Sequence, residues 1–444
     1  WSRVMSKIVL FEDSGFANLL PMLYWRTVFE LRCGRGSLAA RIERLLGAQP
    51  AGLWTRAWIA EVAAERFNLP INQPAAAGDV LVNGRWLPDE PMTFGQDPVV
   101  GMCDGEIAYV VCDEQLARRL GPEHFLDPDG RSELMEGEAD LGRVIETTGK
   151  VMRYPWDVIT TSRELLTAEW SATDAAVEGE VHDSAVLLNV GAIRIERGAR
   201  IMPGVVLDAA DGPIVIEEGV KVCPHTYVGG PAYIACGSVI NPHANIHGGT
   251  SVGPRCKLGG EIDACVFQGY SNKQHDGFLG HSYVGQWVNL GAGTVNSDLK
   301  NTYGTVRMPI NGEPIDTGQM FVGAVIGDHA KTAIGTTIGT GSVIGFGANV
   351  VFSRLLPQFV RSFSWITDRQ FAEGDIQKLA ETAGKAMGRR NVSMTPAETA
   401  LFLKLPQMVA YFEPAVAAQK LAFELMGRIH QATPVAQPED PAMR

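Results

Sequence analysis

An aliphatic residue recurs at every sixth position through much of the second half of the chain, and this spacing restricts the fold more than any other feature. The run from Ile216 to Leu258 contains eight such residues without a break. A period of six suits neither an α-helix nor a strand with alternating faces. Glycine often follows the aliphatic residue, which favours a tight corner there. The repeated positions are Ile195, Ile201, Leu207, Ile216, Val222, Val228, Ile234, Ile240, Ile246, Val252, Leu258, Ile326, Ile338, Ile344 and Val350, with Thr332 at the sixth place after Ile326.

Repeats of six residues predict a parallel β-helix. Three such repeats make one triangular coil, the coils stack at a strand spacing of about 4.8 Å, and the aliphatic side chains fill the interior. The pattern predicts this solenoid over residues 176–352, with interruptions at 272–278 and 298–319 where polar residues enter. Loops leave a solenoid at its interruptions, and functional residues are often carried on such loops.

The part before the repeat alternates between strand-like and helix-like segments, which predicts an α/β domain over residues 5–139. Apolar runs at 7–11, 79–82 and 107–112 predict buried strands, and residues 38–46 have the spacing of an amphipathic helix.

Two further segments complete the predicted organisation. Residues 140–175 predict a connector with a helix that packs beside the first coil. After the solenoid, apolar residues at helical spacing predict a helical region over 366–430, and the Pro-rich stretch 431–444 predicts a flexible tail.

Composition narrows the classes of partner. The 444 residues carry 38 Lys and Arg against 50 Asp and Glu, a net charge of -12, so no basic field is available to attract nucleic acid or an anionic membrane. No apolar run approaches the roughly 20 residues of a membrane span, and Trp1–Leu10 lacks the features of a signal peptide. Seven dispersed cysteines without a C-x-x-C pair favour the reducing cytoplasm. We therefore expect a cytoplasmic protein that acts on a small molecule.

The stretch 272–294 carries a resemblance to a known family. It contains His275, the tripeptide Phe278-Leu-Gly and the run Asn289-Leu-Gly-Ala-Gly-Thr. This segment resembles the acetyltransferase active site of the bifunctional sugar-phosphate nucleotidyltransferase/acetyltransferases that make UDP-N-acetylglucosamine, in particular a group with a shortened first domain. The resemblance implies a divergent, Rossmann-like nucleotidyltransferase domain, a left-handed β-helix, a C-terminal helical region and a homotrimer.

The resemblance also implies a catalytic set and a co-substrate. His275 matches the general base that takes a proton from a sugar amine or hydroxyl while it attacks the thioester of acetyl-CoA or another acyl-CoA. Imidazole suits this task because its ordinary pKa is about 6.5. Asn289 and Asp298 are the candidates that orient the acceptor, whereas His281 and His329 are expected to be corner residues without a catalytic role.

The same family holds the pantetheine arm of CoA in a groove lined by small residues. Ala292 and Ala324 match that lining, and Phe346 stands where the family usually has a small residue, so its ring is expected to narrow the groove.

On the acceptor side, the family's basic residues correspond to Asn241 and Gly259, and its Tyr corresponds to Phe278. We expect Lys273, Lys300 and Asn301 to contact the acceptor instead. Nearby cations could form a further anion clamp or only solubilise exposed faces: Arg255, Lys257, Lys273, Lys300 and Arg307.

The first domain departs from the family's nucleotide site. The loop after the first strand has one glycine and no basic residue, where the family has a Gly-rich loop for the triphosphate and later an Asp for Mg²⁺. The candidates for binding a nucleotide are Glu12, Asp13, Arg26, Asn83 and Arg85. Sugar-1-phosphate nucleotidyl transfer with an NTP and Mg²⁺ is therefore an alternative function.

Two other interpretations stay open. A non-catalytic trimeric scaffold could sense a nucleotide sugar through a degraded first domain. A hexapeptide-repeat metalloenzyme would bind zinc through histidines, and His225 and His243 are one coil apart, with His247 nearby. The spacing fits an exterior histidine ladder better, so we expect no metal site.

Overall fold

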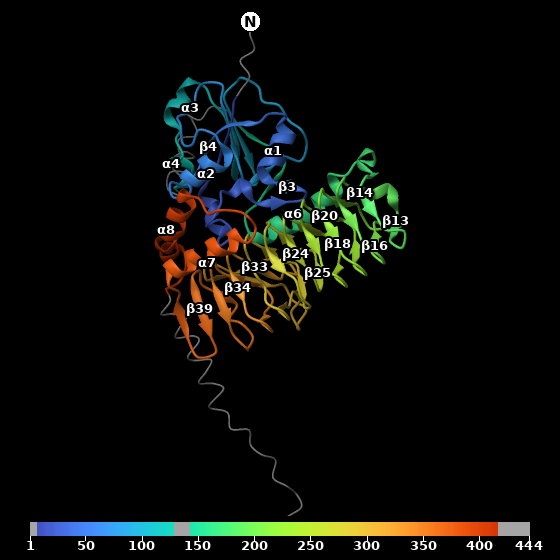
Figure 1. Cartoon of the computed structure of the whole chain (residues 1–444). Helices are drawn as coiled ribbons and strands as arrows, with labels where there is room; N and C mark the ends of the chain where they lie inside the picture. The colour runs from blue at the N-terminus through green and yellow to red at the C-terminus, as the bar shows by residue number, and fades with distance from the viewer. Residues whose placement is uncertain (1–6, 128–142, 416–444) are drawn as a thin grey trace, which may run out of the picture.

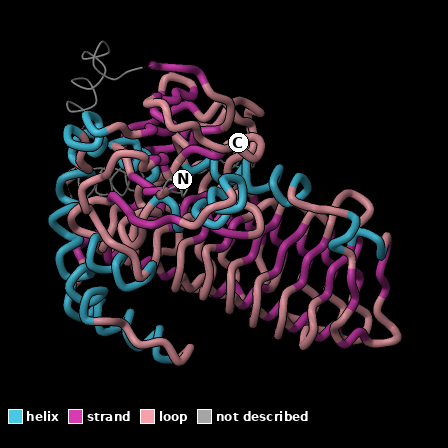
Figure 2. The backbone as a smooth tube through the Cα atoms, turned by 90° about the horizontal axis from the view of Figure 1, so that it is seen from above, coloured by secondary structure: helices cyan, strands magenta, loops and turns pink. Residues whose placement is uncertain are grey.

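The computed structural model describes residues 7–127 and 143–415, which form an α/β domain, a long solenoid and two C-terminal helices (Figure 1). The α/β domain and the two helices lie along one side of the solenoid, and the coils run on beyond them as a row of parallel strands (Figure 2). Within these residues, no helix is both long and apolar enough to cross a membrane. Residues 128–142 of the predicted first domain and connector, residues 416–430 of the predicted helical region and the predicted tail lie outside the described residues.

The α/β domain is built on a mixed six-stranded sheet in the order β4-β1-β5-β8-β7-β9. Strand β1, next to the edge strand β4, runs parallel to β4 and β5, and β8 runs antiparallel to β5 and β7. The predicted strands at 7–11, 79–82 and 107–112 correspond to β1, β5 and β8, and are confirmed. The sheet comprises β1 (Ile8–Phe11), β4 (Pro50–Trp54), β5 (Val80–Asn83), β7 (Val99–Cys103), β8 (Glu106–Val111) and β9 (Arg143–Glu146).

Helices and short strands surround this sheet. The predicted helix is α1 (Leu38–Leu46): the Ser37 hydroxyl accepts a hydrogen bond from the amide of Ala40, and Gly47 ends the helix in the left-handed conformation. The remaining elements are β2 (Arg32–Cys33), β3 (Gly36–Ser37), α2 (Ala60–Phe67), β6 (Trp86–Leu87), α3 (Glu114–Arg119), α4 (Glu123–Leu126) and β10 (Lys150–Val151).

The solenoid is a left-handed parallel β-helix of the hexapeptide-repeat type, with three faces. All the repeated aliphatic residues are buried inside it, which confirms the six-residue interpretation. The first face carries ten paired strands: β11 (Ala176–Val177), β14 (Ile193–Ile195), β17 (Ile214–Ile216), β20 (Ala232–Ile234), β23 (Thr250–Val252), β26 (Val266–Phe267), β29 (Tyr283–Val284), β33 (Ala324–Ile326), β36 (Ser342–Ile344) and β38 (Phe359–Val360).

The second and third faces are shorter or interrupted. The second face comprises β12 (Glu180–Val181), β15 (Arg200–Ile201), β18 (Lys221–Val222), β21 (Val239–Ile240), β24 (Lys257–Leu258), β27 (Asn272–Lys273), β34 (Lys331–Thr332), β37 (Asn349–Val351) and β39 (Ser364–Thr367), with Asn289 bridging β27 and β34. The third face comprises β13 (Val186–Leu188), β16 (Val206–Asp208), β19 (Tyr227–Gly229), β22 (Asn245–Ile246), β25 (Glu261–Asp263), β28 (Phe278–Gly280), β30 (Val295–Asn296) and β35 (Thr337–Ile338).

The interruption predicted at 298–319 is a loop that leaves the solenoid. It contains the hairpin of β31 (Arg307–Ile310) and β32 (Glu313–Asp316). The solenoid itself continues one coil past the predicted end at 352, to β38 and β39. The sixth-residue spacing hides this coil, because the buried residue after Leu356 is Val360, only four positions later.

We expected the connector helix α6 (Pro155–Ala168) to pack beside the first coil, but this prediction is wrong. The helix contacts β23, and its Leu166 packs against Val215 and Tyr233 on β17 and β20, so it covers the third to fifth coils. The physical reason is the outer surface of the first face: the outward positions of the first two coils hold the small Ala176 and the charged Arg194, and large apolar side chains begin only at Val215.

One apolar core joins the α/β domain, the first face and the C-terminal helices α7 (Ile376–Gly388) and α8 (Pro396–Phe412). Phe346 of the solenoid lies in this core between Trp25 of the α/β domain and Phe402 of α8, with ring centroids 5.7 and 5.3 Å away. The position of α7 over the solenoid is therefore fixed by packing, which matters for the sites below.

Candidate functional site

His275 lies on the turn between β27 and β28, and its side chain is exposed. It borders a cavity of about 840 Å³. Several walls of this cavity are small residues, which leaves room for an extended ligand beside the imidazole. The lining consists of Gln274, His275, Asp276, Ala292, Gly293, Ile334, Gly335 and Ser353.

The turn that carries His275 is held from inside the solenoid by Lys273. The Lys273 ammonium donates hydrogen bonds to the carbonyl oxygens of Gly259, at 3.1 Å, and of His275, at 2.9 Å. Burial lowers the pKa of Lys273 to about 8. Lys273, predicted to contact the acceptor, is 1 % exposed and acts on the backbone of the turn instead.

Of the three residues predicted to line the CoA groove, only Ala292 borders this cavity. Ala324 is fully buried in the core of the solenoid, and its amide donates to the Ser282 hydroxyl at 2.9 Å. Phe346 is fully buried in the core shared with the α/β domain. The structure therefore places Ala324 and Phe346 in packed interiors, away from the cavity beside His275.

Asp298 is paired with a histidine other than His275. Its Oδ2 lies 2.8 Å from Nδ1 of His281, which stands at the corner between β28 and β29. Lys300 donates to the carbonyl of Thr305 within its own loop, at 2.9 Å, and Asn301 is exposed. These three predicted residues belong to the loop that leaves the solenoid, and they do not line the His275 cavity.

The His281–Asp298 pair is a feature that the sequence reasoning missed. His281 borders a cavity of about 370 Å³ between α6 and the solenoid, and its ring stacks on Phe321 at a centroid distance of 5.4 Å. A carboxylate bonded to one ring nitrogen fixes the orientation of an imidazole, as in many catalytic pairs. The partner lies 17 residues away, which is the length of one coil at this point of the solenoid, so the coil spacing was the signal that could have indicated the pair.

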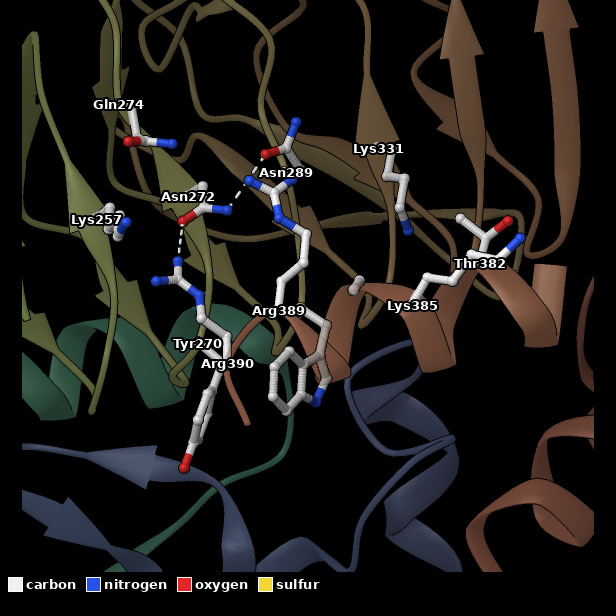
Figure 3. Close-up of a pocket in the computed structure, with 12 residues that line it drawn as sticks. Lys257, Tyr270, Asn272, Gln274, Asn289, Lys331, Thr382, Lys385, Arg389 and Arg390 are labelled. Atoms are coloured by element: carbon white, nitrogen blue, oxygen red, sulfur yellow. Dashed lines mark hydrogen bonds between the residues drawn. The ribbon is translucent and has the colours of Figure 1, made fainter. Parts of the chain in front are cut away.

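Asn289 lies in a third cavity, of about 360 Å³, between the second face and α7 (Figure 3). Asn272 donates to Oδ1 of Asn289 at 3.3 Å, and Arg390 donates to Oδ1 of Asn272 at 2.5 Å. Figure 3 shows Arg389 and Arg390 extending from the end of α7 toward these two amides. The lining consists of Lys257, Tyr270, Asn272, Gln274, Trp287, Asn289, Lys331, Thr382, Lys385, Ala386, Arg389 and Arg390.

This cavity collects basic residues that the sequence did not bring together. Of the cations considered for an anion clamp, only Lys257 lines it, while Arg255 donates to the backbone carbonyl of Arg390 at 3.1 Å. Burial lowers the pKa of Lys331 to about 8 and also lowers that of Arg390. Gln274 lines both this cavity and the His275 cavity, so the two sites adjoin.

Glu12, a candidate for binding a nucleotide, is fully buried and bonded within the α/β domain. Arg56 donates to both of its oxygens, at 2.9 and 3.0 Å, and the amide of Val28 donates to it at 2.8 Å. Arg26 is buried too, and it pairs with Asp328 of the solenoid.

The other three nucleotide candidates form a second buried group. Arg85 donates to both oxygens of Asp13, at 2.6 and 2.5 Å, and the Asn83 amide donates to Asp13 at 2.7 Å. Arg85 also lies 3.4 Å from Glu106. In this conformation all five candidates use their polar atoms to stabilise the fold.

The histidines of the alternative metal site make two separate contacts. His225 and His243 stack with centroids 5.3 Å apart, and His247 lies 3.1 Å from a carboxylate oxygen of Glu261. In the described parts of the chain, no group of three or more His, Cys, Asp or Glu side chains is arranged to hold a metal ion. All seven cysteines fall in those parts and are free thiols.

Comparisons with known proteins bear on this geometry. The chain is 33% identical over 141 residues to a bifunctional sugar-1-phosphate nucleotidylyltransferase/acetyltransferase of Sulfurisphaera tokodaii, which covers 31% of this chain and 35% of that protein. It is 33% identical over 159 residues to the bifunctional protein GlmU of Acidithiobacillus ferrooxidans, covering 34% and 33%. The chain thus spans about a third of the length of these curated relatives.

A solved UDP-N-acetylglucosamine acyltransferase of Francisella novicida aligns with 49% of this chain and 75% of its own, at 14% identity and a TM-score of 0.31. Residues 8–175 match the family model described as sugar nucleotidyl transferase. The α/β part of the chain is therefore similar to the sugar nucleotidyl transferases, and about a third of the chain is similar to bifunctional sugar-phosphate nucleotidyltransferase/acetyltransferases.

Proposed function

We propose that this protein is an acyltransferase that moves an acyl group from acyl-CoA to a sugar phosphate or nucleotide sugar, with His275 as the general base. The observation that carries the proposal is the exposed imidazole on a tethered turn, beside a cavity with small walls. The names of the curated relatives support the same chemistry.

The reaction consists of one acyl displacement and two proton transfers, one to His275 and one from it. A ring nitrogen of His275 takes the proton of the acceptor amine or hydroxyl while the freed electron pair attacks the thioester carbonyl carbon. The tetrahedral intermediate collapses, the C–S bond breaks, and the imidazolium returns the proton to the CoA thiolate. Lys273 holds the backbone of the turn, so the imidazole is positioned before the acceptor arrives.

Two of the other predicted site residues have separate roles. Ala292 lines the donor side of the cavity. Asn289, from the adjoining cavity, orients the acceptor. In a homotrimer, a neighbouring subunit would close the open side of the His275 cavity, where Ile334 is 79% exposed.

The test replaces His275 by alanine. We expect kcat for CoA release from acetyl-CoA, with glucosamine 1-phosphate and UDP-sugars as trial acceptors, to fall by about a hundredfold or more. His243→Ala, at an exterior corner of the same solenoid, is the matched control and should keep full activity. Equal activity of His275→Ala and the wild type would remove His275 from the mechanism.

A second candidate is nucleotidyl transfer by the α/β domain, which the family match over residues 8–175 favours. It requires the buried pairs Glu12–Arg56 and Asp13–Arg85 to open for an NTP and Mg²⁺. Release of pyrophosphate from UTP and a sugar 1-phosphate, lost in Arg85→Met, would support it. If neither CoA nor pyrophosphate is released by the wild type while nucleotide sugars still bind, the trimeric scaffold becomes the better interpretation.

A further inference from the structure

Five cations surround the cavity between the second face and α7, and they come from opposite walls. Lys257 and Lys331 project from strands of the solenoid, while Lys385, Arg389 and Arg390 come from α7 and the turn after it. Across residues 7–127 and 143–415, none of these five side chains forms an ion pair, and no Asp or Glu lines the cavity.

Such an arrangement is costly unless an anion occupies it. Like charges a few ångströms apart repel, and more strongly where water is partly excluded. The negative end of the α7 dipole offsets part of this repulsion for Lys385 and Arg389, because both stand in the last turn or just beyond it. It does not account for Lys257 and Lys331, which face α7 from the opposite wall.

Only some of the N–H groups of these cations donate hydrogen bonds within the protein. Lys331 donates to the carbonyl of His329 at 2.8 Å, and Arg390 donates to Asn272. An ammonium has three donor hydrogens and a guanidinium has five, so most remain for a ligand. Guanidinium groups bind phosphate with paired hydrogen bonds, and lysine adds a point charge.

One wall of the same cavity is aromatic. Trp287 and Tyr270 stand at successive corners of the solenoid and stack with centroids 4.4 Å apart. A volume of about 360 Å³ lies within the range of small-molecule sites, and it exceeds what a single phosphate fills. The ligand is therefore expected to carry several negative charges together with a ring that can lie against Trp287.

We propose that this cavity binds the diphosphate group of a nucleotide-derived ligand, with the five cations around the phosphate oxygens and Trp287 against the attached ring. Both CoA and nucleotide sugars carry such a diphosphate. The inference rests on the proposed function only for its choice of these two ligands, since binding of the anion does not need His275.

The cavity adjoins the His275 cavity through Gln274, which lines both. A diphosphate held by α7 would therefore anchor one end of a ligand whose reacting end lies at the imidazole. The family that this chain resembles has basic residues at two positions where this chain has Asn241 and Gly259. In this chain, the basic residues at the end of α7 supply positive charge beside the solenoid in their place.

The experiment is calorimetric titration of the full chain with inorganic pyrophosphate, UDP, UDP-N-acetylglucosamine and CoA, with adenosine as the uncharged probe. We expect pyrophosphate to bind and adenosine not to bind. The double variant Lys385→Ala/Arg389→Ala should weaken pyrophosphate binding by about tenfold or more, because each cation contributes charge-assisted hydrogen bonds.

Two matched controls separate the site from general surface charge. Lys221→Ala lies on the same outward row of the second face, two strands before Lys257, and Lys378→Ala lies at the other end of α7. Both should bind pyrophosphate as the wild type does. Lys257→Gln, from the wall opposite α7, provides a second test that leaves the helix untouched.

The outcomes decide both the site and the source of the diphosphate. If only CoA binding falls in the double variant, the cavity holds the acyl donor, and if only UDP and UDP-N-acetylglucosamine binding falls, it holds the acceptor. Unchanged pyrophosphate binding in both the double variant and Lys257→Gln overturns the proposal, as does a wild type that binds none of the four anions. His275→Ala should bind all of them normally, so failed catalysis and failed binding remain distinguishable.

Discussion

Lys273 stands at a position that the six-residue repeat gives to aliphatic side chains. It is in register with Leu258 of the preceding coil, so its ammonium points into the prism. A cation is tolerated there because it bonds the carbonyls of Gly259 and of His275. The interior of the solenoid therefore carries a residue that serves the turn outside it.

Replacing Lys273 by leucine should separate stability from activity. The aliphatic side chain fits the interior, so we expect the free energy of unfolding to change by less than about 1.5 kcal/mol. We expect kcat to fall while KM for acyl-CoA changes little, because the His275 turn loses its tether. Calorimetric melting and initial-rate kinetics check this, and an unchanged kcat would show that Lys273 only fills space.

The same residue predicts a pH dependence of stability. Its pKa of about 8 in the folded protein lies below the ordinary value of 10.5, so the unfolded chain binds more protons between these values. Stability therefore rises as the pH increases from about 8 to about 10.5, by roughly 3 kcal/mol for a shift of this size. Lys331 adds a second rise of the same sign, since its pKa is also about 8. Urea unfolding at several pH values should show a smaller rise in Lys273→Leu than in the wild type.

At the scale of elements, a buried ion pair connects the α/β domain to the solenoid. Arg26, just before the short helix η2 (Val28–Glu30), pairs with Asp328 at the corner between β33 and β34, and both are almost fully buried. Asp328 also accepts a hydrogen bond from the amide of Gln286 at 2.5 Å. The pair thus joins three segments that are far apart in the sequence.

Breaking this pair should be costly, and removing both charges should cost less. We expect Arg26→Met to lower the free energy of unfolding by about 3–5 kcal/mol, since it leaves Asp328 charged and without its cation. The double variant Arg26→Met/Asp328→Asn should recover part of that loss. Urea denaturation of the wild type, Arg26→Met, Asp328→Asn and the double variant measures the coupling. Strictly additive losses would contradict it, and a loss of UTP affinity without a loss of stability would favour a nucleotide role for Arg26.

At the scale of the whole molecule, the open side of the His275 cavity carries exposed apolar residues. Ile334, which lines the cavity, is 79% exposed, and Leu355, two residues after the lining residue Ser353, is 66% exposed. Such side chains favour burial against another surface. This placement supports the proposed homotrimer, in which the active site is completed by a neighbouring subunit.

Ile334→Asp tests this assembly. The wild type should elute with three times the chain mass of 48.0 kDa in size-exclusion chromatography with light scattering, and the variant should dissociate because a charge enters the interface. Acyl transfer should fall with it. Tyr411→Asp, at an equally exposed position on α8, should leave mass and activity unchanged. A wild type that is monomeric yet fully active would contradict the proposed trimer.

The sequence by itself determined the architecture, because each coil is specified by local spacing. Every repeated position from Ile195 to Val350 is buried, and the α1 helix begins and ends at the predicted residues. His275 and Ala292 lie within one short segment of the sequence, and both border the same cavity, while their roles stay predictions. These features depend on residues that are close along the chain.

Only the tertiary structure decided which distant residues meet. It paired Arg26 of the α/β domain with Asp328 of the solenoid, and it packed Phe346 against Trp25. It also brought α7 over the second face, so that cations from residues 257 to 390 surround one cavity. Such contacts form where apolar surfaces of elements far apart in the sequence pack together. The six-residue spacing is a local pattern, so it does not indicate which distant elements pack.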